Sequence, residues 1–187
     1  MGSKDSVPPR LSSRRAYSGR VISLDVDTVR FPDGSVGELE MVRHPGASAV
    51  VPFLDDPASS DPRILLIHQY RYAADAYLLE IPAGRLEDGE SPEFCAAREL
   101  EEETGRKARK LEKLVAFYTT PGFTDERIHL FMAWELESGR VARERDEFIE
   151  ERSIHLSEAI RLIDSGEISD AKTAVGIMIA SRRRLRS

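Results

Sequence analysis

The most constraining feature of this sequence is a helix predicted over residues 92–104, because both of its ends are marked. Ser91 is a favoured N-cap residue, and Pro92 stands at the first helical position, where a missing N–H is tolerated. Gly105 follows the last turn and can adopt the left-handed conformation that ends a helix. The side chains of this segment therefore have predictable directions.

Three acidic side chains of this helix share one face. At 100° per residue, Glu99, Glu102 and Glu103 fall together, whereas Glu101 points away from them. The opposite arc is formed by residues that can pack on a sheet, namely Ala96, Ala97, Leu100 and Thr104. Like charges at this spacing repel one another by roughly 0.2–0.5 kcal/mol per pair, so a cation should compensate them.

The chemistry of these carboxylates narrows the choice of cation. Carboxylates are hard oxygen ligands, which suit Mg²⁺ or Mn²⁺ rather than zinc. The alternative is an acidic helix face that is simply exposed to solvent. The residues before the helix favour the metal site.

The helix and the loop before it resemble a Nudix box. Eight specified positions match over residues 84–106: Gly84, then Glu90 after five residues, then after seven more Arg98, Glu99, Leu100, Glu102, Glu103 and Gly105. Arg106 stands where the family pattern has an aliphatic residue. This difference affects packing after the helix and leaves the acidic residues unchanged.

The resemblance implies a hydrolase that uses divalent cations to neutralise a diphosphate, so that water can attack phosphorus. It makes Glu99 and Glu103 the principal metal ligands, with Glu102 and the carbonyl group of Ala83 as additional ones. Glu102 and Glu103 are also expected to be catalytic. The implied cofactor is Mg²⁺, with Mn²⁺ as an alternative.

The other residues of the box are expected to be structural. Glu90 and Arg98 should form an ion pair that holds the loop against the helix, and direct contact of Glu90 with metal is the alternative. Gly84 should shape the loop, and Gly105 should end the helix.

Residues outside the box resemble the ADP-ribose pyrophosphatase branch of the family. The matching runs are Gln69–Tyr72, Leu79–Gly84 and Thr120–Glu126. The resemblance implies that Arg71 binds a phosphate or the terminal ribose, and that Glu80 accepts hydrogen bonds from the ribose or base. An ion pair of Arg71 with a loop carboxylate is the structural alternative. The candidates for stacking on adenine are Phe31, Tyr17 and Tyr118.

A further carboxylate is expected from the loop over residues 137–147. Enzymes of this branch take a metal ligand or general base from a late loop, and Glu147 matches that position best. Arg145 stands where related enzymes place the base, so Glu144, Asp146, Glu147 and a metal-bound hydroxide are alternatives for this role. A solvated charged loop is the structural alternative.

The strand pattern predicts an α/β (α+β) fold. Apolar and polar residues alternate over 21–29 and over 128–136, as in half-buried strands. Further strands are predicted over 38–43, 49–53, 64–72, 78–81, 111–118 and 149–156, and further helices over 158–164, capped by Ser157, and 171–182, capped by Asp170. This pattern favours a Nudix fold of mixed β-sheets sandwiched between helices, preceded by an N-terminal antiparallel β-hairpin.

Three parts are expected along the chain. Residues 1–16 form a flexible arm, residues 17–45 an N-terminal β region, and residues 46–187 the Nudix hydrolase domain. A hairpin of this size is too small to be stable alone, and in related enzymes it crosses to a partner subunit. We therefore expect a homodimer with a swapped N-terminal region.

Composition excludes several classes of partner. A formal net charge of −6 argues against sequence-independent binding of nucleic acid. No apolar run approaches the roughly 20 residues of a membrane span, so no membrane partner is expected. The single cysteine, Cys95, cannot form an internal disulfide, and we expect a cytoplasmic protein.

The leading functional hypothesis is Mg²⁺-dependent hydrolysis of ADP-ribose, or of a related ADP-sugar, to AMP and a sugar 5-phosphate. A diphosphatase for NADH, a diadenosine polyphosphate or an oxidised nucleotide is the second hypothesis. A non-catalytic Nudix-like ligand sensor is the third, and the presence of Glu99, Glu102 and Glu103 argues against it.

Overall fold

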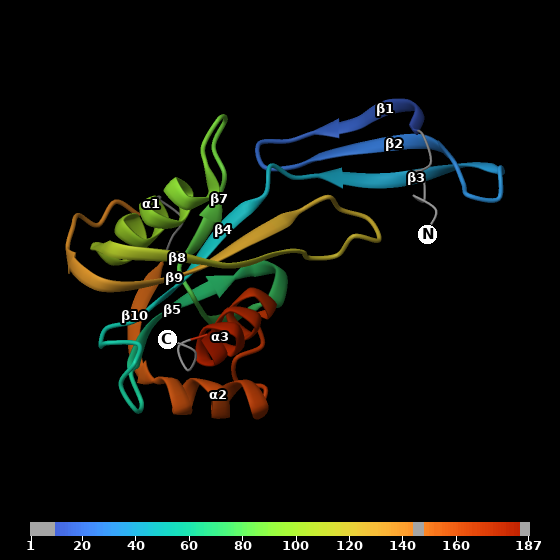
Figure 1. Ribbon diagram of the computed structural model, residues 1–187. Coiled ribbons are helices and arrows are strands. Elements are labelled where there is room, and N and C mark those ends of the chain that lie inside the picture. Colours follow the sequence, from blue (N-terminus) through green and yellow to red (C-terminus); the bar gives the residue numbers. More distant parts are fainter. Residues whose placement is uncertain (1–9, 144–147, 184–187) are drawn as a thin grey trace, which may run out of the picture. The chain divides into compact units, whose positions relative to one another are not determined.

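A computed structural model describes residues 10–143 and 148–183 of the chain (Figure 1). The polypeptide forms two compact units. Among the described residues, the first contains residues 10–46 together with Tyr118–Arg127, and the second contains Ala47–Phe117 and residues 128–143 and 148–183. None of the described helices is long and apolar enough to cross a membrane.

The first unit is built on a three-stranded antiparallel sheet in the order β1-β2-β3. Its strands are β1 (Arg10–Ser18), β2 (Ser23–Arg30) and β3 (Val36–Arg43). In the turn between β2 and β3, Gly34 has φ +87°, and the Asp33 carboxylate accepts a hydrogen bond from the Ser35 N–H at 2.9 Å. The predicted hairpin is therefore present, and a glycine supplies the left-handed backbone that its turn requires.

Strand β1 corrects one prediction. The expected flexible arm over residues 1–16 is wrong for residues 10–16, which belong to β1, while residues 1–9 lie outside the described part. Every residue of β1 is exposed, so the strand has no buried face that an apolar pattern could mark. It is held by backbone pairing with β2 and by the ion pair of Arg15 with Asp25. A polar segment becomes a strand here because a neighbouring strand offers it hydrogen bonds.

Two aspartates of β2 are buried and are neutralised by arginines. Arg43, at the end of β3, donates to Asp25 at 3.1 Å and also pairs with Asp27. The same guanidinium donates to Asp125 at 3.2 Å, which ties the loop of Asp125 to β3. Hydrogen bonding from Arg15, together with Arg43, holds the pKa of Asp25 below its ordinary value against the opposing effect of burial.

The second unit contains two sheets. One has the order β7-β4-β9-β8, with β4 and β9 parallel, and the other has the order β10-β5-β6. The strands are β4 (Ala47–Pro52), β5 (Arg63–Arg71), β6 (Ala76–Glu80), β7 (Ala83–Arg85), β8 (Arg106–Tyr118), β9 (Arg127–Ser138) and β10 (Ile149–His155). The helices are α1 (Pro92–Thr104), α2 (Leu156–Asp164) and α3 (Ala171–Arg183), and a 3₁₀ turn, η1, covers Tyr72–Ala74.

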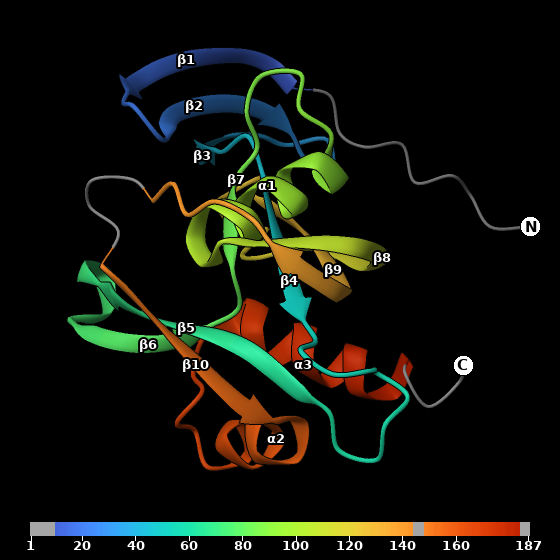
Figure 2. The same ribbon diagram turned by 90° about the vertical axis from the view of Figure 1, so that its left-hand side faces the viewer.

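Strand β4 lies at the centre of the second unit and is buried along almost its whole length. Ala49 and Val51 belong to a core shared with β5, α2 and α3, whereas Val50 packs in a smaller core with Ala96 and Leu100 of α1. Helix α1 therefore covers one face of the four-stranded sheet, and α3 and β5 lie on the other, as Figure 2 shows. The predicted class of mixed sheets between helices is confirmed.

The two later helices begin in different ways. Asp170 caps α3 as predicted, because its carboxylate accepts a hydrogen bond from the Thr173 N–H at 3.0 Å. The prediction that Ser157 caps α2 is wrong, because the helix begins at Leu156. Asp61, from a distant loop, accepts hydrogen bonds from the Ser157 N–H at 3.0 Å and from its hydroxyl at 2.7 Å. A carboxylate from elsewhere in the chain thus satisfies an N–H in the first turn of this helix.

The Thr173 hydroxyl links α3 to the end of β6. It accepts a hydrogen bond from the Ile81 N–H at 2.9 Å, and both residues are buried.

Thr173→Val keeps the shape of the side chain but removes that acceptor, so the free energy of unfolding should fall by about 1–3 kcal/mol in urea unfolding. Thr28→Val is the matched control, because the Thr28 hydroxyl accepts from exposed Ser12, and it should change stability by less than about 0.5 kcal/mol. Equal losses in the two variants would contradict this role of Thr173.

Candidate active site

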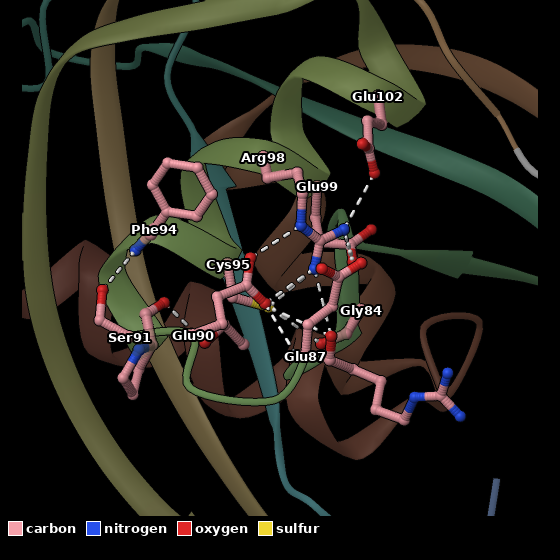
Figure 3. A network of polar contacts seen from close by, with 12 residues as sticks. Gly84, Glu87, Glu90, Ser91, Phe94, Cys95, Arg98, Glu99 and Glu102 are labelled. Atoms are coloured by element: carbon pink, nitrogen blue, oxygen red, sulfur yellow. Dashed lines mark hydrogen bonds and ion pairs between the residues drawn. The ribbon is translucent and has the colours of Figure 1, made fainter.

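Helix α1 has the ends that the sequence predicts. Ser91 Oγ accepts a hydrogen bond from the Phe94 N–H at 3.2 Å (Figure 3). Pro92 is the first helical residue. Gly105 ends the helix at φ +64°, and its N–H donates to the Glu101 carbonyl oxygen at 2.7 Å. These caps set the register of the helix and therefore the direction of each carboxylate on it.

The acidic residues of α1 separate onto different faces, as expected. Glu99 and Glu103 are buried, with 8% and 2% of their surface exposed, and Glu102 lies at the edge with its side chain 37% exposed. Glu101 is bound elsewhere, by Lys107 at 3.2 Å and by the backbone N–H of Arg140 at 3.1 Å. Burial of carboxylates is unfavourable unless they are paired or bind a metal, so the Glu99 and Glu103 face requires partners.

The two buried carboxylates lie against adjacent residues of β7, Ala83 and Gly84. The Ala83 N–H donates to Glu103 Oε2 at 3.1 Å. At Gly84, a Cβ atom would lie 1.9 Å from Glu99 Oε1, which is far inside a van der Waals contact. Glycine is therefore required at position 84 because the Glu99 carboxylate fills the space where a side chain would begin.

Arg98 is the centre of the charged network in Figure 3. Its guanidinium donates to Glu90 at 2.8 and 3.0 Å, to Glu99 at 2.6 Å and to Glu102 at 2.9 Å. The expected pair of Glu90 with Arg98 is present and joins the loop to α1. Hydrogen bonding from Arg98 lowers the pKa of Glu90 to about 2. The single charge of Arg98 cannot by itself balance the three carboxylates that it contacts.

Cys95 lies beneath the network and supports the loop. It is buried, and its Sγ lies 3.5 Å from the Gly84 carbonyl oxygen and 3.6 Å from that of Arg85. Burial, reinforced by the charges of Glu90 and Glu99, raises the pKa of the thiol to about 12. A thiol with this pKa is protonated at neutral pH, so Cys95 is a packing residue and not a nucleophile.

The two candidate substrate-binding residues are bound to each other. Arg71 donates to both carboxylate oxygens of Glu80, at 2.7 and 2.8 Å. Burial opposes the ionisation of Glu80, but Arg71 and Lys172 outweigh it and hold the pKa of Glu80 below its ordinary value. Hydrogen bonding to Glu80 raises the pKa of Arg71 against the opposing effect of burial. Glu80 stands three residues before Ala83, whose N–H binds Glu103, so the pair is close in sequence to the strand that contacts the box carboxylates. The ion pair considered as the alternative for Arg71 is present, with a strand carboxylate in place of a loop one.

Lys172 is a residue of this site that sequence reasoning does not find. Its Nζ pairs with Glu80 and lies 3.0 Å from Asp170 Oδ2. The residue stands in the first turn of α3, 92 positions after Glu80. The local signal at this point is the N-cap Asp170, which marks the start of a helix but carries no information about the strand opposite it.

The remaining predicted carboxylates cannot be placed. Glu144, Asp146 and Glu147, the loop candidates for a metal ligand or general base, lie outside the described residues. Their roles stay predictions.

The three aromatic candidates for adenine stacking have different surroundings. Tyr17 is exposed on β1, and Tyr118 is exposed with the Arg127 guanidinium 5.8 Å from the centre of its ring. Phe31 packs over Gly37, where a Cβ atom would lie 2.7 Å from the Phe31 ring. Stacking on a base stays a prediction for each of them.

The donor set beside β7 fits a hard divalent cation. Glu99 and Glu103 place carboxylate oxygens at adjacent residues of one strand, and Glu102 can approach from the edge. Within residues 10–143 and 148–183, no three acidic, histidine or cysteine side chains already converge on one point. Arg98 holds oxygens of Glu99 and Glu102 through its own hydrogen bonds. Cation binding would therefore require these side chains to turn away from Arg98.

The ion pair of Glu90 with Arg98 should make stability depend on pH. The pKa of Glu90 is about 2 in the folded chain, below its ordinary value of 4.5, so the pair contributes stability above pH 4.5 and loses it as the pH falls toward 2. Glu90→Gln should lower Tm at pH 7, and circular dichroism should show the difference from the unsubstituted chain shrinking as the pH approaches about 3. Glu87→Gln, in the same loop, is the control. A difference in Tm that stays constant over this range would contradict the assignment.

Comparisons with known proteins identify the family of this chain. The NUDIX domain model matches residues 43–174. An ADP-ribose pyrophosphatase of Bacillus subtilis (strain 168) is 45% identical over 89% of each chain, and a methanol dehydrogenase activator of Bacillus methanolicus is 40% identical over 89% of each chain. The crystal structure of an ADP compounds hydrolase has a TM-score of 0.82 at 20% identity, and covers 99% of this chain and 97% of that one. The predicted resemblance is confirmed, and the chain belongs to the Nudix family.

Proposed function

We propose that this chain hydrolyses the diphosphate bond of ADP-ribose, or of a related ADP-sugar, to AMP and a sugar 5-phosphate with Mg²⁺ as cofactor. The observation that carries the proposal is the pair of buried carboxylates, Glu99 against Gly84 and Glu103 bound by the Ala83 N–H. The similarity to an ADP-ribose pyrophosphatase supports the choice of substrate.

A divalent cation is the general requirement of Nudix hydrolases. The residues that would hold it are Glu99 and Glu103, with Glu102 and the Ala83 carbonyl group as further ligands. When bound, the cation supplies positive charge that neutralises the diphosphate oxygens and the charge that develops on them. Mg²⁺ suits this set because every donor is a hard oxygen, and Mn²⁺ shares that preference. Glu147 is the loop carboxylate proposed to complete the site.

The residues around the box have separate tasks in this proposal. Arg71 presents to a phosphate the N–H groups that Glu80 does not use, a role that suits a planar and permanently charged guanidinium. Glu80 is almost fully buried and engaged by Arg71 and Lys172. It therefore acts on the substrate through Arg71, in place of the direct contact with ribose or base expected from the resemblance.

A product assay with the full chain tests the function. ADP-ribose and Mg²⁺ should yield AMP, and EDTA should abolish turnover until Mg²⁺ is restored. The panel includes other ADP-sugars, NADH, a diadenosine polyphosphate and an oxidised nucleotide. A preference for one of the last three would support the second hypothesis, and no cleavage of any compound would support the sensor.

Two variants on different faces of α1 distinguish a carboxylate at the proposed metal site from one outside it. Glu103→Gln should lower kcat by about 100-fold or more, because it removes a carboxylate from the proposed metal site, while circular dichroism shows an intact fold. Glu101→Gln is the matched control and should have little effect on kcat, because Glu101 binds Lys107 and the Arg140 backbone instead. Equal losses would mean that the faces of α1 are wrongly assigned.

We also propose a cytoplasmic homodimer in which residues 17–45 cross to the partner. Apolar side chains are exposed on the strands of the first unit, among them Leu11, Tyr17, Val36 and Leu39, and exposed apolar surface is typical of interfaces. The cytoplasmic location is supported by Cys95, which is buried and has no second cysteine to pair with. Sedimentation velocity measures the oligomeric state, and a fully active monomer would contradict the dimer.

A further inference from the structure

Four charged side chains form a cluster where β5, β6 and α3 meet. Arg71 binds both oxygens of Glu80 at 2.7 and 2.8 Å. Lys172 pairs with the same carboxylate and lies 3.0 Å from Asp170. The cluster contains two cations and two anions, so it is neutral as a whole, and Glu80 is the anion shared by both cations.

The members of this cluster differ in their access to water. The side chain of Glu80 is 1% exposed and that of Lys172 is 13% exposed, whereas that of Arg71 is 39% exposed. A carboxylate as buried as Glu80 needs cations beside it, because water cannot solvate its charge. Arg71 is the most exposed of these three and is therefore the one that can meet an anion arriving from solvent.

The two contacts of Arg71 with Glu80 use one edge of its guanidinium. Nε and Nη2 donate to the carboxylate, so Nη1 points away from it in the fixed fork of this side chain. If Glu80 had no other cation, its charge would cancel that of Arg71. Because Lys172 takes part of the Glu80 charge, Arg71 retains positive charge that is available to a phosphate.

Hydrogen bonds at the start of α3 fix the position of Lys172. The Asp170 carboxylate accepts hydrogen bonds from the Thr173 N–H and hydroxyl at 3.0 and 2.5 Å. The Thr173 hydroxyl in turn accepts from the Ile81 N–H, the residue that follows Glu80. These hydrogen bonds therefore hold the first turn of α3 against the end of β6, next to the ion pair of Lys172 with Glu80.

We propose that Lys172 is a positioning residue for substrate binding, which balances Glu80 so that the Arg71 guanidinium stays aligned and positively charged toward the diphosphate. This inference rests on the proposed function, because the anion it assigns to Arg71 is the diphosphate of a nucleotide sugar. The contact with phosphate exists before and during the reaction, so loss of Lys172 weakens binding more than the chemical step.

Steady-state kinetics with ADP-ribose and Mg²⁺ test the role of this charge. Lys172→Met should raise KM about tenfold with little change in kcat, and Lys172→Arg should restore KM to within about twofold of the unsubstituted chain. Asp170→Asn, which can still cap α3, leaves the cluster with a surplus positive charge and should lower KM. Lys107→Met is the matched control, since it removes a lysine paired with Glu101, and it should leave both constants unchanged.

A double substitution tests whether Lys172 acts through Arg71. In an Arg71→Met background, adding Lys172→Met should raise KM by less than about twofold, because the group that it positions is already absent. Calorimetry of ADP-ribose binding in metal-free buffer should show the same pattern in Kd. A tenfold effect that persists in the Arg71→Met background would overturn the proposal, and so would an increase in KM for Asp170→Asn.

The outcomes separate this inference from the proposed function. If the unsubstituted chain does not cleave ADP-ribose, the proposed function fails. If it cleaves ADP-ribose and Lys172→Met has an unchanged KM, only the role of Lys172 fails. Circular dichroism checks the fold of every variant, and if Lys172→Met does not fold, the direction of the change in Asp170→Asn decides the question.

Discussion

The carboxylates of Glu99 and Glu103 repel each other and lose hydration when α1 packs on its sheet. Several contacts within the second unit offset this cost. A glycine at position 84 leaves room for one carboxylate, and the Ala83 N–H binds the other. Apolar residues on the opposite side of α1 hold the helix down. Without that packing, the acidic face would turn to solvent, because nothing in the helix itself favours burying charge.

Arg98 by itself does not neutralise the acidic face. Arg98 contacts Glu90, Glu99 and Glu102, which reduces their repulsion while the helix folds. A single positive charge leaves an excess of negative charge, which a divalent cation would satisfy. The cluster around Glu80 is different, because Arg71 and Lys172 together neutralise it and Asp170. The first cluster therefore suits a cation, whereas the second is neutral as a whole.

Much of the candidate site could be predicted because its determinants are local. The bounds of α1, its caps and the faces of its carboxylates follow from residues within one segment, since helical geometry converts spacing into direction. The pair of Glu90 with Arg98 spans a single loop and helix turn. Strand β1 and the three-residue strand β7 could not be predicted in the same way, because a strand with no buried apolar face leaves no pattern. The cap of α2 was equally hidden, because Asp61 reaches Ser157 from a distant loop.

The sequence by itself determined the acidic helix, its glycine loop, the N-terminal hairpin and the family to which the chain belongs, because each of these is encoded in neighbouring residues. Only the tertiary structure decided that Glu80 binds Arg71 and Lys172, that Arg43 joins β2 to the loop of Asp125, and that residues 118–127 belong with the N-terminal sheet. These contacts join residues far apart in the chain. Their partners are selected by burial, which forces each charge to find an opposite one wherever the fold brings it near.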